Sequence, residues 1–219
     1  MTVVYVAALC AAALLVAAGC SAEKDANRAP SGDRDRTAAK PPEAAKGNPV
    51  VIIETSKGTI KAELWADKAP ITVANFLRYT DEHHYDGLIF HRIVDGFMIQ
   101  GGGMTPDGNP RRGHEPIRNE ARPELRNQRG TLAMARTNVV DSATSQFFIN
   151  LVDNGPKGLD QRSRTPDGFG YCVFGKVIEG MDVVDKIAQV PTKFGPGGEK
   201  SVPLETVEIV RVRRAEAKP

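Results

Sequence analysis

The chain has 219 residues, which is enough for one domain with a full hydrophobic core and an appended segment. Its formal net charge is +2, so composition gives no electrostatic argument for nucleic-acid binding, which requires a clustered basic face. The four histidines lack the spacing of metal ligands, and a single cysteine outside the first twenty residues cannot form an intrachain disulfide framework, so neither kind of site is expected.

Residues 1–20 are predicted to be a signal sequence. Residues 3–18 are apolar, and a run this short, ending in small residues, fits a secretory signal better than a membrane span. Residues 17–20, Ala-Ala-Gly-Cys, resemble the lipobox of bacterial lipoproteins, in which the cysteine carries the lipid. We therefore expect an exported protein, in the periplasm or at the cell surface, anchored to the membrane through a lipid on Cys20. Simple secretion and a retained anchor are the alternatives.

Residues 21–48 are predicted to be a disordered linker. They are rich in Ala, Lys, Arg, Asp, Glu, Pro and Gly and contain no aromatic residue, so they cannot bury enough apolar surface to offset their ordering entropy. As a flexible tether they would let a domain sample about 30 Å from its attachment point. The folded domain is expected over residues 49–214, followed by a short tail at 215–219.

From residue 49 onward the sequence has the pattern of short strands. Two β-type runs, 50–53 and 59–65, flank Ser-Lys-Gly, which is a hairpin signal. Pro70 precedes a helical pattern over 71–79, and a second helix is predicted over 180–190. Further strands are predicted over 88–94, 97–100, 131–135, 146–151, 171–178 and 206–212. Many short strands, two helices and no βαβ alternation indicate a mainly β protein, built as an antiparallel barrel or sandwich.

Residues 90–102 combine a cation, an amide and two soft apolar side chains within two neighbouring predicted strands. Because side chains alternate along a strand, Phe90 and Arg92 are expected on one side of the first strand. Met98 and Gln100 are expected to share a side of the second strand for the same reason. This segment is the first candidate for a binding or catalytic site.

A second segment, Ser-Gln-Phe-Phe-Ile, places Gln146 and Phe148 on one face of a later strand. Taken alone, the apolar residues of both segments fit a hydrophobic core, and Arg92 fits a charge at its rim, better than they fit a site. His91, on the opposite face from Arg92, is interpreted as a packed or exposed histidine. Cys172 has no obvious histidine partner and is interpreted as a small buried hydrophobe.

Three segments resemble the signature segments of the cyclophilins, namely residues 90–102, residues 130–150 and residues 174–181. The similarity runs in the family's order from about residue 50 to residue 212. The resemblance implies a mainly β fold, a closed antiparallel eight-stranded β-barrel capped by two α-helices. It also implies peptidyl-prolyl cis/trans isomerase activity, which needs no cofactor and no metal.

Matched residue by residue, the resemblance implies that Arg92, Phe97 and Gln100 are catalytic. It implies that the substrate is bound by Met98, Ala135, Arg136, Gln146, Phe148, Leu159 and Tyr171. The Ala-Arg pair within this set is similar to the bacterial, periplasmic type. Glycine at position 158 and tyrosine at 171 stand where many members have tryptophan and histidine, so cyclosporin is expected to bind weakly.

The expected partners are unfolded or flexible polypeptides that contain proline, and the expected role is to assist the folding of secreted or envelope proteins. The core is expected to be monomeric. The main alternative is a non-catalytic module that binds proline peptides while tethered to the membrane. A third interpretation is a lipoprotein whose domain contacts an envelope partner through a surface outside the groove.

Overall fold

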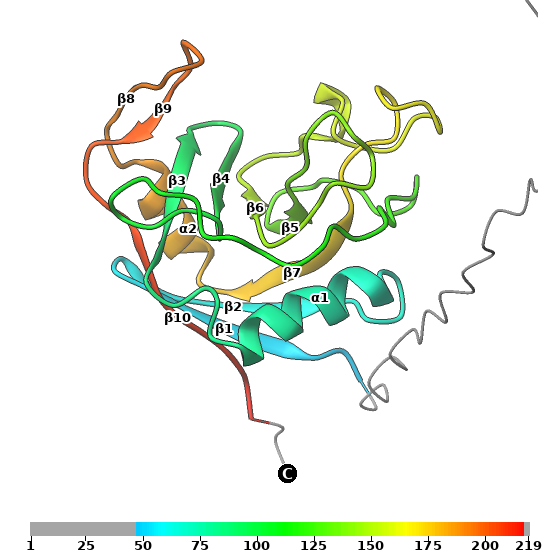
Figure 1. Cartoon of the computed structure of the whole chain (residues 1–219), viewed down its shortest axis with the longest axis horizontal. Coiled ribbons are helices and arrows are strands. Elements are labelled where there is room, and N and C mark those ends of the chain that lie inside the picture. The colour runs from blue at the N-terminus through cyan, green and yellow to red at the C-terminus, as the bar shows by residue number, and fades with distance from the viewer. Residues whose placement is uncertain (1–46, 217–219) are drawn as a thin grey trace, which may run out of the picture. The chain divides into compact units, whose positions relative to one another are not determined.

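The computed structural model describes residues 47–216 of the chain (Figure 1). The predicted signal sequence, the predicted lipidation site Cys20 and most of the predicted linker lie outside the described residues, as does the end of the tail. Within the described part, none of the helices has the length and apolar character that a membrane span requires.

Eight strands close into an antiparallel barrel in the order β1-β10-β3-β4-β6-β5-β7-β2. They are β1 (Val50–Thr55), β2 (Gly58–Leu64), β3 (Leu88–Val94), β4 (Met98–Gly101), β5 (Thr131–Met134), β6 (Phe147–Asn150), β7 (Val173–Glu179) and β10 (Glu208–Arg214). Closure pairs strands that are distant in sequence, such as β3 with β10 and β2 with β7, and leaves the barrel no open edge. The predicted mainly β class and the eight-stranded barrel are confirmed.

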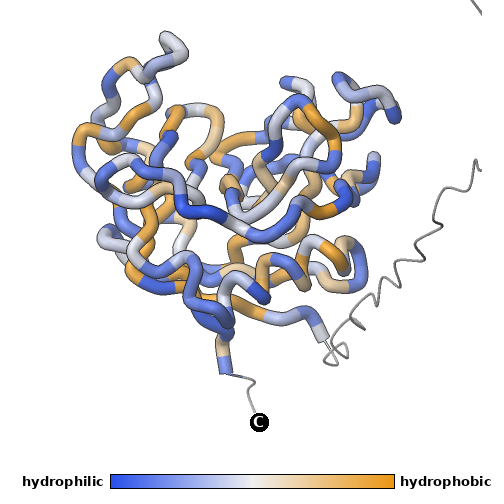
Figure 2. Tube along the Cα trace, in the orientation of Figure 1, coloured by the Kyte–Doolittle hydropathy of each residue, from blue (hydrophilic) through white to orange (hydrophobic). Residues whose placement is uncertain are grey.

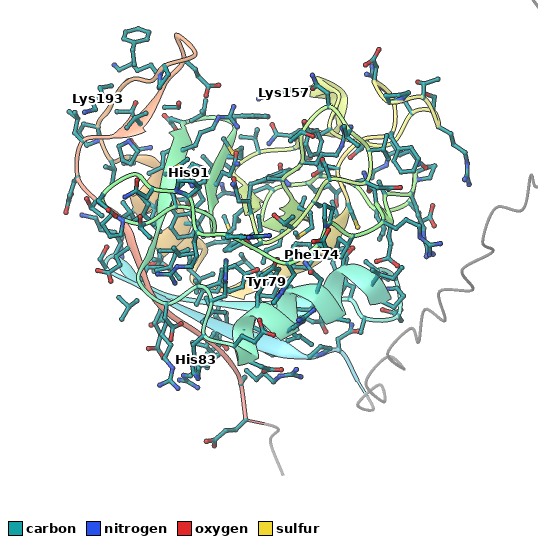
Figure 3. All side chains as sticks on the ribbon, viewed as in Figure 1. Tyr79, His83, His91, Lys157, Phe174 and Lys193 are labelled. Atoms are coloured by element: carbon teal, nitrogen blue, oxygen red, sulfur yellow. The ribbon has the colours of Figure 1, made fainter. Side chains whose placement is uncertain are left out.

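Two helices pack against the barrel. The first, α1 (Pro70–Asp81), begins with Pro70, whose fixed φ suits the first helical turn and whose missing N–H has no helical partner to lose there. The buried face of α1 inserts Phe76 into the core, where its ring centroid lies 5.2 Å from that of Phe174. Figure 3 shows Phe174 between α1 and the strands behind it. The second helix, α2 (Met181–Ala188), packs beside β2.

The main core fills the inside of the barrel, and Figure 2 shows much of the apolar sequence on the strands and helices. In β3 the core residues are Leu88, Phe90 and Ile93, so the inward spacing changes from two residues to three. The cause is a β-bulge between Phe90 and Arg92, which inserts one residue and reverses the alternation. Arg92 contacts Met98, outside this core, so the prediction that Phe90 and Arg92 share a side is wrong.

A small two-stranded sheet, which was not predicted, lies beside the barrel without being part of it. It consists of β8 (Thr192–Phe194) and β9 (Lys200–Pro203), paired antiparallel around a glycine-rich turn. Its strands are three and four residues long, too short to produce a clear alternating pattern in the sequence. Strand β9 lies next to β3, so the hairpin flanks the strand that carries Arg92 (Figure 1).

Candidate functional site

A second apolar cluster, here called the outer cluster, lies on the outside of the barrel against β4, β5, β6 and β7. Its buried members are Met98, Leu125, Ala133, Phe148 and Val173, and its partly buried members are Trp65, Val94, Phe97, Ala135, Leu159 and Tyr171. The structure thus brings six of the predicted site residues together, namely Phe97, Met98, Ala135, Phe148, Leu159 and Tyr171. These six residues come from five separate stretches of the sequence, and the pairing of β4 to β7 together with the loop between β6 and β7 makes them neighbours.

A row of polar side chains borders the outer cluster. Arg92 Nη1 donates to Gln100 Oε1 at 3.2 Å and lies 3.8 Å from Met98 Sδ. Gln100 Nε2 in turn donates to Gln146 Oε1 at 2.9 Å. The guanidinium also lies 5.8 Å from the ring centroid of Phe97. The predicted polar residues Arg92, Gln100 and Gln146 therefore form one connected row at the edge of the apolar pocket.

Strand register explains this row. Arg92 is the direct cross-strand partner of Gln100 in the β3–β4 pair, and the bulge that precedes Arg92 turns it to the side that Gln100 occupies. Gln146 immediately precedes β6, which pairs with β4, so its side chain comes within reach of the Gln100 amide. Because arginine only donates hydrogen bonds, it fixes the amide of Gln100 with the oxygen towards itself and the nitrogen towards Gln146.

Arg136 is held by backbone carbonyls. Its guanidinium donates to the carbonyl oxygens of Gly170 at 3.0 Å, Thr137 at 2.8 Å and Pro166 at 3.3 Å. Its face also covers the ring of Tyr171 at 4.8 Å. A side chain with these contacts braces the loop that precedes Tyr171.

Leu159 is brought into the outer cluster by a short bend. It follows a single turn of 3₁₀-helix, η1 (Gly155–Lys157), and Gly158, whose φ of +99° lies in the left-handed region. The carbonyl of Leu159 accepts the N–H of Tyr171 at 2.9 Å, which ties the two ends of the long loop together. Glycine at 158 is therefore required by the backbone, because an L side chain at this φ is strained.

Three buried asparagines, which were not predicted, hold the backbone of two site residues through hydrogen bonds. Asn127 donates to the carbonyl oxygen of Leu159 at 3.0 Å, and Asn154 donates to that of Phe97 at 2.7 Å. Asn150 connects them, because it donates to Asn127 Oδ1 at 3.3 Å and accepts from Asn154 at 2.8 Å. Their exposed fractions are all zero, as expected of polar groups that are hydrogen-bonded within the protein, and no local pattern in the sequence distinguishes them.

Glu199, also not predicted, lies on the outer side of Arg92. Its carboxylate accepts from Nε at 2.7 Å and from Nη2 at 2.8 Å, in a two-point ion pair. The hydrogen bonds from Arg92 are the main cause that holds the pKa of Glu199 below its ordinary value. Glu199 therefore stays ionised at neutral pH.

Two titratable groups near the site, the half-buried His91 and the buried Cys172, are not suited to proton transfer. Burial lowers the pKa of His91, and its Nδ1 has no hydrogen-bond partner among the described residues. Burial raises the pKa of Cys172 to about 11, so the thiol stays protonated and unreactive at neutral pH. The prediction that Cys172 is a small buried residue is confirmed, since it is 3 % exposed.

A cavity of about 490 Å³ lies elsewhere, lined mainly by residues 118–124 together with Asp141, Arg164 and Phe169. None of the predicted site residues lines it, so it is separate from the outer cluster. Among residues 47–216 there is no group of three or more His, Cys, Asp or Glu side chains placed to hold a metal ion.

The chain resembles known proteins over nearly all of its described part. Residues 50–214 match the family model described as cyclophilin type peptidyl-prolyl cis-trans isomerase/CLD. The chain is 50% identical over 169 residues to a peptidyl-prolyl cis-trans isomerase of Acinetobacter baylyi, a match that covers 77% of this chain and 87% of the relative. It is also 50% identical over 167 residues to peptidyl-prolyl cis-trans isomerase B of Escherichia coli, covering 76% of this chain and 100% of the relative.

A solved structure of a cyclophilin is also similar to this chain. A cyclophilin type peptidyl-prolyl cis-trans isomerase of Cryptosporidium parvum, crystallised in the presence of the dipeptide Ala-Pro, is 27% identical with a TM-score of 0.60. That match covers 77% of this chain and 99% of the Cryptosporidium parvum chain. With the family model spanning the whole barrel and relatives at half identity, the chain belongs to the cyclophilin family and is a peptidyl-prolyl cis-trans isomerase.

Proposed function

We propose that this isomerase accelerates rotation about X-Pro bonds with Arg92 as the catalytic donor, and with Phe97 and Gln100 as its catalytic partners. One observation carries the proposal: Arg92 Nη1 points along the edge of the outer cluster, 3.2 Å from Gln100 Oε1 and 3.8 Å from Met98 Sδ. The side chain of Arg92 is 34 % exposed, so a bound peptide can reach it.

The physics of the reaction explains why a guanidinium is the main chemical group required. Amide resonance gives a barrier of about 18–20 kcal/mol to rotation. In the twisted transition state that resonance is lost, and the prolyl nitrogen regains a lone pair. A donor at that nitrogen binds the twisted form better than either planar form, and only such differential binding raises the rate of the chemical step. Arginine suits the role because it stays charged and its fork is rigid.

One hydrogen bond is not sufficient by itself. An acceleration of about 10⁵-fold corresponds to about 7 kcal/mol of transition-state stabilisation. A hydrogen bond to a charged group contributes about 1.5–3 kcal/mol in net terms. We assign the remainder to preorganisation in the apolar pocket, where the proline ring is clamped while the preceding carbonyl rotates.

The outer cluster supplies that clamp in this proposal. Met98, Phe148 and Leu159 form the walls of the proline pocket, and Tyr171 extends them on the side of the long loop. Gln146 and the backbone at residues 135–136 bind the main chain of the peptide. Because the guanidinium of Arg136 is engaged with three carbonyls, that residue acts through its backbone and through its support of Tyr171.

We further propose that the substrates are flexible, proline-containing segments of exported proteins, that the enzyme assists their folding, and that its core acts as a monomer. The structure of the Cryptosporidium parvum relative in the presence of Ala-Pro supports a proline peptide as ligand. The signal-like residues 1–20, with Cys20 in a lipobox-like setting, support export and anchoring by a lipid. The named isomerases at 50% identity favour an enzyme over a non-catalytic binding module.

Exchange spectroscopy by NMR on an Ala-Pro-Phe type peptide tests the catalytic proposal. The protein should speed cis/trans exchange, and Arg92→Ala should lose that effect while its spectrum shows an intact fold. An active Arg92→Ala variant would remove Arg92 from the mechanism. A protein that binds the peptide without speeding exchange would instead support the tethered binding module.

Export and lipidation need a separate test. Full-length protein expressed in a bacterium should incorporate radiolabelled palmitate and sediment with the membranes, and Cys20→Ala should lose the label. Unlabelled wild-type protein recovered from the soluble periplasmic fraction would support simple secretion in place of an anchor. The folding role is tested by whether the enzyme speeds the refolding of a model protein that is limited by a prolyl bond.

A further inference from the structure

The β8–β9 hairpin lies outside the barrel and supplies no part of the proline pocket described above. It nevertheless brings one side chain to the site, because Glu199 stands immediately before β9 and contacts Arg92 from 107 positions away in the sequence. Figure 1 shows the hairpin beside the end of β3, on the same side of the molecule as the β3–β4 turn.

The geometry of the contact divides the guanidinium into two edges. Glu199 accepts from Nε at 2.7 Å and from Nη2 at 2.8 Å, which is the two-point pairing of arginine with a carboxylate. The remaining nitrogen, Nη1, is directed to Gln100 and Met98 at the proline pocket. A planar fork held at one edge cannot rotate, so the direction of Nη1 is set by Glu199.

The hairpin holds Glu199 in place through its turn. The carbonyl of Glu199 accepts the N–H of Gly195 at 2.9 Å, and the N–H of Gly198 closes the turn onto the carbonyl of Gly195 at 3.0 Å. The base of the hairpin is closed by the N–H of Leu204, which donates to the carbonyl of Pro191 at 2.8 Å. The carboxylate is therefore presented from a hydrogen-bonded frame and not from a free loop.

We infer that Glu199 is a positioning residue for catalysis, and that it fixes the guanidinium of Arg92 so that Nη1 faces the prolyl nitrogen in the twisted state. Without Glu199, Arg92 would sample several rotamers in water and would lose that entropy on each turnover. The remaining hydrogen bond to Gln100 fixes one point only and leaves the plane of the fork free. This inference rests on the proposed role of Arg92 and adds a second residue to it.

Positioning and structural roles predict different results. An exposed ion pair contributes little to folding, so Glu199→Ala should unfold at nearly the same temperature as wild type. Its kcat should fall about tenfold, since misplacing a catalytic group by a small distance costs rate, whereas KM should change less than twofold. Glu199→Gln, which keeps size but cannot form the charged two-point pair, should behave similarly. Glu205→Ala removes a comparable exposed pair with Lys57, remote from the site, and should leave kcat unchanged.

The experiment is exchange NMR on a proline peptide at limiting and saturating concentrations, with the Nε–Hε signal of Arg92 as a second readout. That signal, assigned through Arg92→Lys, should be protected from solvent exchange in wild type and in Glu205→Ala, and lost in both Glu199 variants. Unchanged kcat in the Glu199 variants, with Arg92→Ala inactive, would overturn the inference and leave the role of Arg92 standing. A faster Glu199→Ala would also overturn it, because the pair would then be a brake. An active Arg92→Ala would refute the proposed function itself.

Discussion

Gln100 of β4 and Gln146 before β6 are joined by a hydrogen bond of 2.9 Å between their side-chain amides, and Arg92 sets its direction. Because the guanidinium can only donate, Gln100 must present its oxygen to Arg92 and its nitrogen to Gln146. The three residues act as a unit, in which the cation at one end orders the amide at the other. A peptide bound across the groove meets a polar row with a defined order of donors and acceptors.

We expect the effects of Gln100→Ala and Gln146→Ala to be strongly non-additive. Each single change should lower kcat/KM by about tenfold, because either one breaks the row that holds the other amide. The double variant should then be little worse than Gln100→Ala alone. Exchange measurements on all four members of the cycle give the coupling. Effects that simply multiply would show that the two amides contact the substrate independently.

Arg92→Lys tests geometry at constant charge. A lysine ammonium is a single point on a flexible stem, so it cannot pair with Glu199 at two points and also reach Gln100. We expect a folded variant whose activity is about 100-fold lower, in the range found for loss of one preorganised donor. Near-normal turnover of this variant on a proline peptide would mean that charge alone, without the fork, is sufficient.

Much of the fold followed from local pattern, and the errors have physical causes. The strand β3 and the helix α1 were predicted correctly because a β-type run and a helical pattern after proline can be recognised from consecutive residues. The predicted side of the strand for Arg92 was wrong because a β-bulge adds one residue, and nothing in the sequence indicates the bulge. The strands predicted to begin at Phe97 and Gln146 begin one residue later, at Met98 and Phe147. Backbone hydrogen bonding, and not residue propensity, decides where a strand begins.

The candidate site was predicted by resemblance and completed by topology. The six predicted members of the outer cluster were identified because they match family motifs, not because composition distinguished them from core residues. Glu199 could not be predicted as a site residue, because a carboxylate in a glycine-rich turn is usually a solvated charge. Its contact with Arg92 exists only in the folded protein. The asparagines at 127, 150 and 154 were missed for a similar reason, since three of the four hydrogen bonds described above join residues at least 23 positions apart in the sequence.

Removing the central asparagine should destabilise the fold and loosen the pocket. Asn150→Ala removes the only hydrogen bond to Asn127 Oδ1 among the described residues, and it also removes the bonds that Asn150 makes with Asn154 Nδ2 and Thr131 Oγ1. We expect the free energy of unfolding to fall by about 2–4 kcal/mol, since one unpaired buried acceptor costs about 1–3 kcal/mol and each other lost hydrogen bond about 0.5–1.5 kcal/mol. Urea denaturation measures the change, and the exposed Asn138→Ala is the matched control. A loss no larger than that of Asn138→Ala would show that water replaces the network.

Position 158 should determine cyclosporin sensitivity in a way that a single substitution cannot reverse. The wild-type enzyme, with glycine there, should be inhibited only weakly when the drug is titrated against isomerase activity. Gly158→Trp should not restore tight inhibition, because a residue with a φ of +99° pays about 1–2 kcal/mol of strain or moves the loop. Tight inhibition of the wild type would show that the loop after η1 places another group where the family's tryptophan stands.

Two half-buried histidines should make the fold less stable in mild acid. Burial is the main cause that lowers the pKa of both His84 and His91 in the folded protein, whereas in the unfolded chain they titrate near 6.5. As the pH falls through 6.5 the unfolded chain takes up protons that the folded protein does not, so the free energy of unfolding decreases until the folded pKa values are passed. The slope is at most about 1.4 kcal/mol per pH unit for each histidine. Urea denaturation between pH 5 and 7.5 should show this decline in the wild-type protein. The double variant His84→Gln/His91→Gln should show a shallower decline. Equal slopes in the two proteins would assign the acid sensitivity to other groups.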